Sequence, residues 1–204
     1  MNQDRRDRLR DAAVVVLAGA GGRGLTHRAV DAAADVPLGT AKNYFPTRDA
    51  LLRAVAERCL ERYRALAGLL AGSGSGPADR AALAALLAGL LRDAAGPGRP
   101  RVVAYLELQA EATRRPWLAA LLDPIAAADF AAYGHLLRTA GLPAGPERAS
   151  ALTLALHGAV SHLLTGAPDT LAAAGLDDLD SFARGLLARV CPEPHEHDEH
   201  EEHS

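Results

Sequence analysis

The sequence predicts an all-α protein, and two observations lead to that fold class. Ala, Leu and Arg, which are strong helix formers, dominate the chain, whereas aromatic residues make up only 4% of it. Between clusters of Pro and Gly, apolar residues recur at every third or fourth position, as in Leu179, Phe182, Leu186 and Val190. The 204 residues, 49% of them hydrophobic, can bury a core as one globular unit or as a small head joined to a larger body.

Pro and Gly divide the chain into about nine expected helices. These are residues 5–19, 27–34, 38–44, 48–71, 79–95, 101–114, 117–140, 147–165 and 178–190. Thr26, Thr47 and either Asp177 or Asp178 precede three of them and can cap the free N–H groups of the first turn. The first three helices are short and the fourth is long.

Charge and cysteine content exclude several classes of protein. The net charge of −3 combines a mildly basic body with residues 193–203, which carry six carboxylates and no Lys or Arg. Cys59 and Cys191 lie far apart without a CxxC partner, which argues against a disulfide scaffold or a cysteine-built zinc site. The sequence has no long uncharged apolar run and no signal-peptide pattern, so we expect a cytoplasmic protein with no membrane partner.

Residues 26–45 carry the clearest functional signal. They read as a capped helix of two turns, a tight turn at Asp35 and Val36, and a second, very short helix. This order is typical of a helix-turn-helix, in which the second helix enters the major groove of DNA. Small apolar residues such as Val30 and Ala33 let the two helices cross closely.

Lys42 lies in the middle of this second helix and is the single lysine of the chain. Its neighbours Gly39, Thr40 and Asn43 are small or polar, so the face around it can approach phosphates and base edges. The alternative is that Lys42 simply occupies a solvated helix face. Residues 1–50 are net +2, which favours only weak electrostatic attraction to DNA.

The head of the chain resembles the TetR family of bacterial transcriptional regulators. The family pattern combines a buried Ala-Ala, Gly-x-x-x-Thr, Ala-Gly-Val-Ser-x-Gly-Thr-x-Tyr-x-Tyr-Phe and Lys-x-x-Leu, matched here by residues 12–13, 22–26, 34–45 and 48–52. Residues 106–116 resemble, more loosely, the start of the regulatory domain in many members. The resemblance implies a helix-turn-helix DNA-binding domain at residues 1–50 and a ligand-binding and dimerisation domain at residues 51–191.

The resemblance also implies which head residues meet DNA. The expected DNA-binding residues are Thr26, Arg28, Thr40, Lys42, Asn43, Tyr44 and Arg48. Thr26 and Arg48 would bind phosphates at the starts of the second and fourth helices, Arg28 would add positive charge, and the other four would face the groove.

Three residues depart from the family pattern. Lys42 replaces a common tyrosine, which exchanges a hydroxyl contact for a charge with longer reach. Asp35 replaces the turn glycine, which is tolerable because Asp can adopt the left-handed conformation. Pro37 replaces the usual capping serine; it can start the helix at its first position but removes the side-chain cap. These departures affect the expected base preference rather than binding itself.

The long fourth helix is expected to act as a lever between head and body. Leu51 and Leu52 would pack beneath the head, and Tyr63 and Leu66 would reach the body, so a ligand that displaces the far end would move the DNA-reading heads of a dimer. The pocket is expected among the fourth to eighth helices. Its candidate lining residues are Tyr63, Tyr105, Gln109, Thr113, Trp117, Phe130, Tyr133 and His157. Core packing or a solvated surface is the alternative for each residue alone.

The last two expected helices each carry an apolar stripe that could pair two chains in a four-helix bundle. The expected dimer residues are Leu152, Leu156, Val160, Leu163, Leu179, Phe182, Leu186 and Val190. The alternative is that both stripes bury within one chain. Residues 192–204 form a tail rich in His and acidic residues, expected to be disordered but able to bind Zn²⁺, Ni²⁺ or Cu²⁺ transiently.

The sequence and its resemblance to the TetR family therefore predict a DNA-binding transcriptional regulator that binds double-stranded operator DNA as a homodimer. The resemblance implies a repressor released by a small-molecule effector. The alternative is a helical dimer that binds a small molecule or metal and no longer reads DNA. An enzyme is not expected: no nucleophile with a base appears, and the glycine-rich residues 19–24 follow no strand, so they fail as a dinucleotide loop. No catalytic residue, cofactor or fixed metal site is expected.

Overall fold

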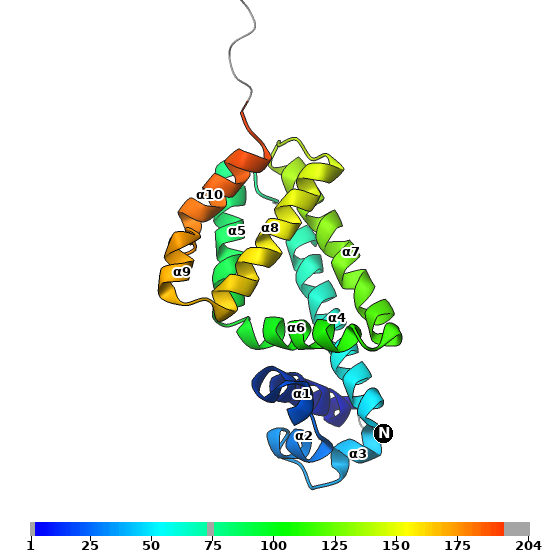
Figure 1. Ribbon diagram of the computed structural model, residues 1–204. Coiled ribbons are helices and arrows are strands. Elements are labelled where there is room, and N and C mark those ends of the chain that lie inside the picture. The colour runs from blue at the N-terminus through cyan, green and yellow to red at the C-terminus, as the bar shows by residue number, and fades with distance from the viewer. Residues whose placement is uncertain (1–2, 73–75, 194–204) are drawn as a thin grey trace, which may run out of the picture. The chain divides into compact units, whose positions relative to one another are not determined.

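The computed structural model describes residues 3–72 and 76–193, with side chains placed outside residues 66–72. Within these ranges the chain forms ten helices and no strand, which confirms the predicted all-α fold (Figure 1). The helices are α1 (Gln3–Gly24), α2 (His27–Ala33), α3 (Thr40–Tyr44), α4 (Arg48–Gly72), α5 (Arg80–Ala95), α6 (Arg99–Ala112), α7 (Pro116–Thr139), α8 (Pro146–Thr165), α9 (Pro168–Ala173) and α10 (Leu179–Val190).

Three of the helix starts have the side-chain caps that the sequence predicted. Thr26, Thr47 and Asp178 accept hydrogen bonds from the N–H groups of Ala29, Ala50 and Ser181 at 3.2, 3.0 and 3.0 Å. The helix α9 was not predicted, because its six residues lie between two breakers and read as a loop.

The described chain divides into two compact units. The first contains residues 3–72 and 93–129, and the second contains residues 76–92 and 130–193. The functional boundary expected near residue 50 stays a prediction, since α4 and α6 both contact α1 within the first unit.

In the first unit α1 contacts α2, α4 and α6. Its core includes Leu9 and Leu17 of α1, Phe45 after α3, and Leu52 of α4, all of them 2% exposed or less. Leu51 and Leu52 thus lie in the same core as α1, where the lever prediction puts them. The side chain of Leu66 lies outside the described residues.

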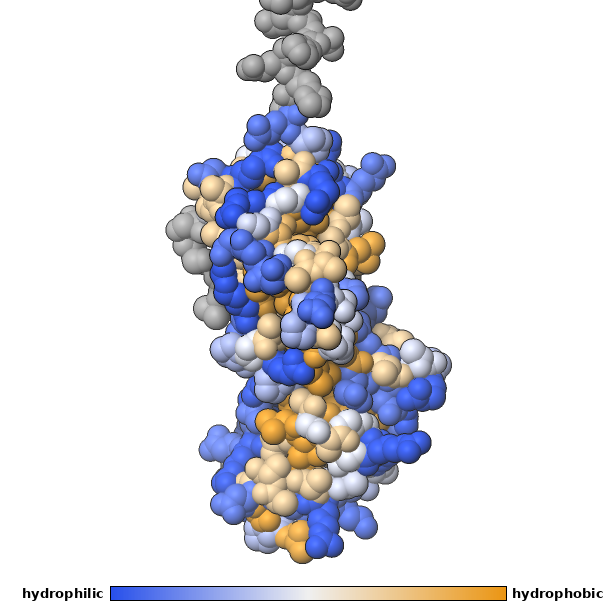
Figure 2. Space-filling model, turned by 60° about the vertical axis from the view of Figure 1, so that its left-hand side comes forward, coloured by the Kyte–Doolittle hydropathy of each residue, from blue (hydrophilic) through white to orange (hydrophobic). Residues whose placement is uncertain are grey.

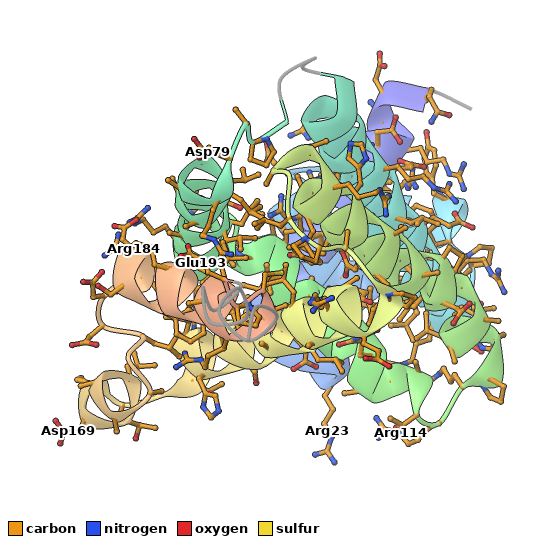
Figure 3. All side chains as sticks on the ribbon, turned by 90° about the horizontal axis from the view of Figure 1, so that it is seen from above. Arg23, Asp79, Arg114, Asp169, Arg184 and Glu193 are labelled. Carbon is orange, nitrogen blue, oxygen red and sulfur yellow. The ribbon has the colours of Figure 1, made fainter. Side chains whose placement is uncertain are left out.

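In the second unit, leucines of α5, α7, α8 and α10 form a separate core that includes Leu87, Leu137, Leu152 and Leu187. Charged side chains such as Arg184 and Asp169 point outward from this unit (Figure 3). No helix among the described residues is both long enough and apolar enough to cross a membrane.

Candidate nucleic-acid interface

The turn between α2 and α3 uses a left-handed aspartate. Asp35 has a φ of 50°, the conformation expected where this chain lacks the turn glycine. Pro37, however, does not begin the next helix, so its expected place at the first helical position was wrong. Gly39 has a φ of 90°, which is not helical, and α3 begins only at Thr40.

Asp31 fixes the start of α3 and was not predicted as a site residue. Its carboxylate, 1% exposed, accepts hydrogen bonds from the N–H groups of Gly39 at 2.7 Å and Ala41 at 2.6 Å. Gly39 has no side chain that could cap α3, so a buried residue of α2 satisfies these N–H groups instead. The signal in the sequence was an acidic residue on the otherwise small, apolar face of α2.

Four residues form the outward side of this motif, and we call them the recognition face. Ala41 and Phe45 are buried at 0% and 2% exposure and mark the inward side of α3. Leu38, Gly39, Lys42 and Asn43 are exposed and make up the recognition face. Two of the four residues predicted to face the groove, Lys42 and Asn43, therefore lie on it.

The other two residues predicted to face the groove are less available for contact with DNA. The hydroxyl of Thr40 donates to the carbonyl of Pro37 at 2.5 Å, and Thr40 is half-buried. Tyr44 is also half-buried and packs against the core, with its ring centroid 6.4 Å from that of Phe45. The structure thus gives both residues contacts within the motif.

The predicted phosphate-binding residues beside the recognition face also differ in exposure and in their contacts within the motif. Thr26 and Arg28 are exposed at the start of α2. Arg48 donates from its guanidinium to the carbonyl of Leu25 at 3.0 Å and to that of Gly22, so it holds the start of α4 against the turn between α1 and α2. This structural contact was not predicted, and it occupies part of the group that was expected to bind a phosphate.

Ion pairs join α1 to α4 beneath the motif. Arg10, only 4% exposed, donates to Asp7 at 3.1 Å and to Glu61 at 2.6 Å. Arg58 binds both carboxylate oxygens of Asp11 at 2.6 and 2.9 Å. Partial burial raises the pKa values of Asp11 and Glu61, but hydrogen bonds and positive charge from the arginines outweigh it, so that both pKa values are lowered.

A second contact joins α1 to α6 at a pair of glycines. Gly21 breaks the helical conformation of α1 with a φ of 66°. The N–H of Gly22 donates to the carboxylate of Glu107 at 3.1 Å, and a Cβ on Gly22 would lie 2.5 Å from a carboxylate oxygen of Glu111. Glycine therefore lets α6 approach this turn closely.

The predicted ligand-binding residues fall into both units. In the first unit Tyr63, Tyr105 and Trp117 are half-buried, whereas Gln109 and Thr113 are exposed. The guanidinium of Arg53 lies 4.6 Å from the ring centroid of Trp117. Phe130, Tyr133 and His157 belong to the second unit, where Tyr133 packs against the core and the other two are exposed.

Asp129 of α7 is a further polar residue near two of these tyrosines. The hydroxyl of Tyr63 donates to its carboxylate. Burial raises the pKa of Tyr105, and the negative charge of Asp129 raises it further. Asp129 thus bonds to one predicted ligand-binding tyrosine, Tyr63, and its charge acts on a second, Tyr105. It was not predicted, although it is an acid in a largely apolar stretch of α7.

Three of the predicted dimer residues lie in the core of their own unit. Leu152, Leu156 and Leu186 are 0, 3 and 7% exposed. The remaining five are partly buried and pack against the same core: Val160, Leu163, Leu179, Phe182 and Val190. Both stripes thus contribute to the core of one chain, and a further contact of the five partly buried residues with a second copy stays a prediction. The outward side of α8 carries other residues.

No group of three or more His, Cys, Asp or Glu residues in the described ranges is placed to hold a metal ion. The predicted His-rich tail from residue 194 onward lies outside those ranges. Cys59 and Cys191 are both free and buried, and burial raises the pKa of the Cys59 thiol to about 11.

The chain is similar to known proteins over most of its length. Residues 78–192 match the profile of the tetracyclin repressor-like C-terminal domain. The multidrug binding protein EbrR complexed with imidazole has 33% sequence identity and a TM-score of 0.62, covering 97% of this chain and 100% of that one. No curated protein matches the chain.

Two further structures have similar identity. EbrR complexed with ethidium has 34% identity and a TM-score of 0.64, with 93% of this chain and 99% of that chain covered. A TetR-family member from Streptomyces coelicolor A3 has the same identity, coverage and TM-score.

Proposed function

Because this chain belongs to the TetR family of transcriptional regulators, we propose that it is a homodimeric repressor that binds operator DNA through the recognition face. A small-molecule effector would release it. The proposed role needs no catalytic step and belongs to the cytoplasm, where the chromosome is.

The recognition face is the observation that carries this proposal. A helix of five residues has too few internal hydrogen bonds to be stable alone. Here its start is tied to Asp31 by two short hydrogen bonds, while Lys42 and Asn43 project outward. A short, rigidly held helix with a cation and an amide outward is suited to phosphates and base edges in the major groove.

Fluorescence anisotropy with DNA from upstream of the protein's own gene, at several salt concentrations, tests DNA binding. We expect binding that weakens with salt, with a smaller salt slope for Lys42→Ala because one phosphate contact is lost. Arg64→Ala, which removes an exposed cation of α4, is the matched control. Absence of binding to every upstream fragment at low salt would favour a helical dimer that no longer reads DNA.

We further propose that the effector is an aromatic organic cation. EbrR, which has 34% identity to this chain, is a multidrug binding protein crystallised with ethidium. In this chain the carboxylate of Asp129, with Tyr63 and Tyr105 nearby, supplies a negative charge and aromatic rings. Such a set attracts a cation by charge and by cation–π contact.

Ethidium itself is the probe for this proposal, since its fluorescence reports binding. Asp129→Asn keeps the shape of the side chain but removes the charge, and we expect at least about tenfold weaker ethidium binding with unchanged DNA binding. Asp123→Asn, an exposed acid on the same helix, serves as the control. An equal loss of ethidium affinity in both variants would indicate general attraction of the cation by negative charge instead.

The outward side of α8 supports a contact with a second copy of the chain. Leu154 is 62% exposed, and Gly158 and Ser161 follow on the same side of the helix. A Cβ on Gly158 would meet nothing within 4 Å, so its small size serves no packing inside the chain and would allow close approach of a partner helix. We expect Gly158→Arg to convert the dimer into monomers in analytical ultracentrifugation, whereas Gly185→Ala on α10 keeps it dimeric.

A further inference from the structure

Leu38, the first residue of the recognition face, exposes an apolar side chain in a polar setting. It is 72% exposed, more than any other large hydrophobic side chain that the structure places. Its exposed neighbours on the recognition face are Gly39, Lys42 and Asn43. Figure 2 shows apolar residues bordered by hydrophilic ones on one face of the first unit.

The backbone on both sides of Leu38 is held in place. The N–H of Gly39 donates to Asp31 at 2.7 Å, and the N–H of Thr40 donates to the carbonyl of Pro37 at 3.1 Å. The proline ring also fixes φ at residue 37. Leu38 is therefore displayed on a rigid turn, so burying it against a partner costs little backbone entropy.

The setting of Leu38 restricts the chemistry of its partner. Lys42, four residues farther on in α3, favours an anionic surface, yet an exposed leucine needs an apolar contact. A membrane or protein partner would be matched by several apolar side chains rather than by one. In the major groove of DNA, the 5-methyl group of thymine is the one apolar group that the base pairs offer.

We infer that Leu38 is a specificity-determining residue that contacts the 5-methyl group of a thymine in each operator half-site. The inference rests on the proposed DNA-binding function and adds the base that the turn before α3 selects. A cytosine at the same position would present an amino group that donates a hydrogen bond, and the leucine side chain has no acceptor for it.

Replacing each operator thymine in turn by deoxyuridine tests this contact, since the exchange removes only the methyl group. In anisotropy titrations we expect about fourfold weaker binding at one thymine per half-site, as for one buried carbon. Leu38→Ala should bind the thymine and deoxyuridine operators equally at that position. Val15→Ala removes another exposed apolar side chain of the same unit, 59% exposed, and should keep the fourfold difference.

Three results would overturn the inference. Operator binding without sensitivity to any deoxyuridine would overturn it while leaving the proposed function intact. A methyl effect that persists in Leu38→Ala would assign the contact to another residue. Absence of binding to any DNA fragment would overturn both the inference and the proposed function. Because Leu38 is exposed, the alanine variant should keep the thermal unfolding curve of the parent protein, which circular dichroism can verify.

Discussion

The two units of this protein differ in the polar groups that they bury in their cores. The first unit buries two charged residues, Arg10 at 4% and Asp31 at 1% exposure, and each bonds to groups from other parts of the fold. The second unit buries Thr153, whose hydroxyl donates to the carbonyl of Ala149 in its own helix. Apolar contact is nondirectional, whereas charged hydrogen bonds fix the angle and register of the groups they join.

The difference suits two different tasks. A recognition helix must present Lys42 and Asn43 at fixed positions, because base readout depends on hydrogen-bond geometry. The second unit, which we propose contacts a second copy of the chain, can adjust its packing among leucines at small cost. We therefore expect substitutions in the second unit to change stability without changing base preference, and substitutions of the buried charges in the first unit to change DNA binding.

The largest effect on stability is expected in the second unit. Leu152 is fully buried, so Leu152→Ala should lower the free energy of unfolding by about 3 kcal/mol through lost burial and the cavity left behind. Denaturant unfolding measures this change. Anisotropy titrations, under conditions where Leu152→Ala is folded, should rank the affinities for a set of operator variants in the same order as for the parent protein. An altered ranking would contradict the division of roles between the units.

Asp31→Asn should lower the free energy of unfolding by about 2 kcal/mol. The N–H of either Gly39 or Ala41 would then lose its charged acceptor and face the N–H of the new amide. The main effect of the substitution should be at least about tenfold weaker DNA binding with unchanged ethidium binding.

A second variant separates positioning from general instability. In Asp31→Ala, the additional change Pro37→Ser adds a hydroxyl that can accept from the N–H groups of Gly39 or Thr40, two and three residues farther on. We expect the double variant to recover part of the DNA affinity lost in Asp31→Ala. Recovery of thermal stability without recovery of DNA affinity would show that Asp31 does not position the recognition face.

Acid should weaken the contact between α1 and α4. The pKa values of Asp11 and Glu61 are lowered from 3.8 and 4.5 in the folded protein, so the unfolded chain binds protons more tightly. Their contribution to stability is present above about pH 4.5 and is lost as the pH falls through the folded values. Both carboxylates are more than a third exposed, so we expect about 1 kcal/mol or less from each.

Hydrogen exchange at pH 6 and pH 3.5 measures this effect locally. Protection should fall in α1 and α4 more than in α8. In the second unit the pKa of Asp178 is also lowered, by hydrogen bonds from the backbone and side chain of Ser181, so the first turn of α10 should fray as well. Equal loss of protection in α1 and α8 would contradict a local role for the ion pairs.

The smallest effect is expected for Thr153→Val. The hydroxyl bonds only within its own helix, so its loss should change the free energy of unfolding by less than about 1 kcal/mol. A cost as large as that of Asp31→Asn would mean that the second unit also depends on a buried polar contact.

Local patterns in the sequence predicted much of the fold. Helical periodicity, breakers and caps at Thr26, Thr47 and Asp178 fixed the order of the helices, because these signals act over a few residues. The six-residue helix α9 was not predicted, because so short a segment between breakers has no detectable hydrophobic period.

The site was predicted in part. Lys42 and Asn43 project outward as expected, since residue type and helix spacing determine this. The bonds from Asp31 to Gly39 and Ala41, and from Arg48 to Leu25, join residues 8, 10 and 23 positions apart. Such contacts depend on how helices pack, which no local pattern encodes. The apolar stripes of α8 and α10 had two possible partners, and periodicity alone could not choose between them.

Protection of guanine N7 from dimethyl sulfate tests most directly whether the recognition face enters the major groove. N7 lies in that groove, and a helix seated there shields it. We predict two protected patches on the operator, with centres separated by a whole number of helical turns, and that Lys42→Ala needs a higher protein concentration to give the same protection. Binding that leaves every N7 reactive would contradict the account.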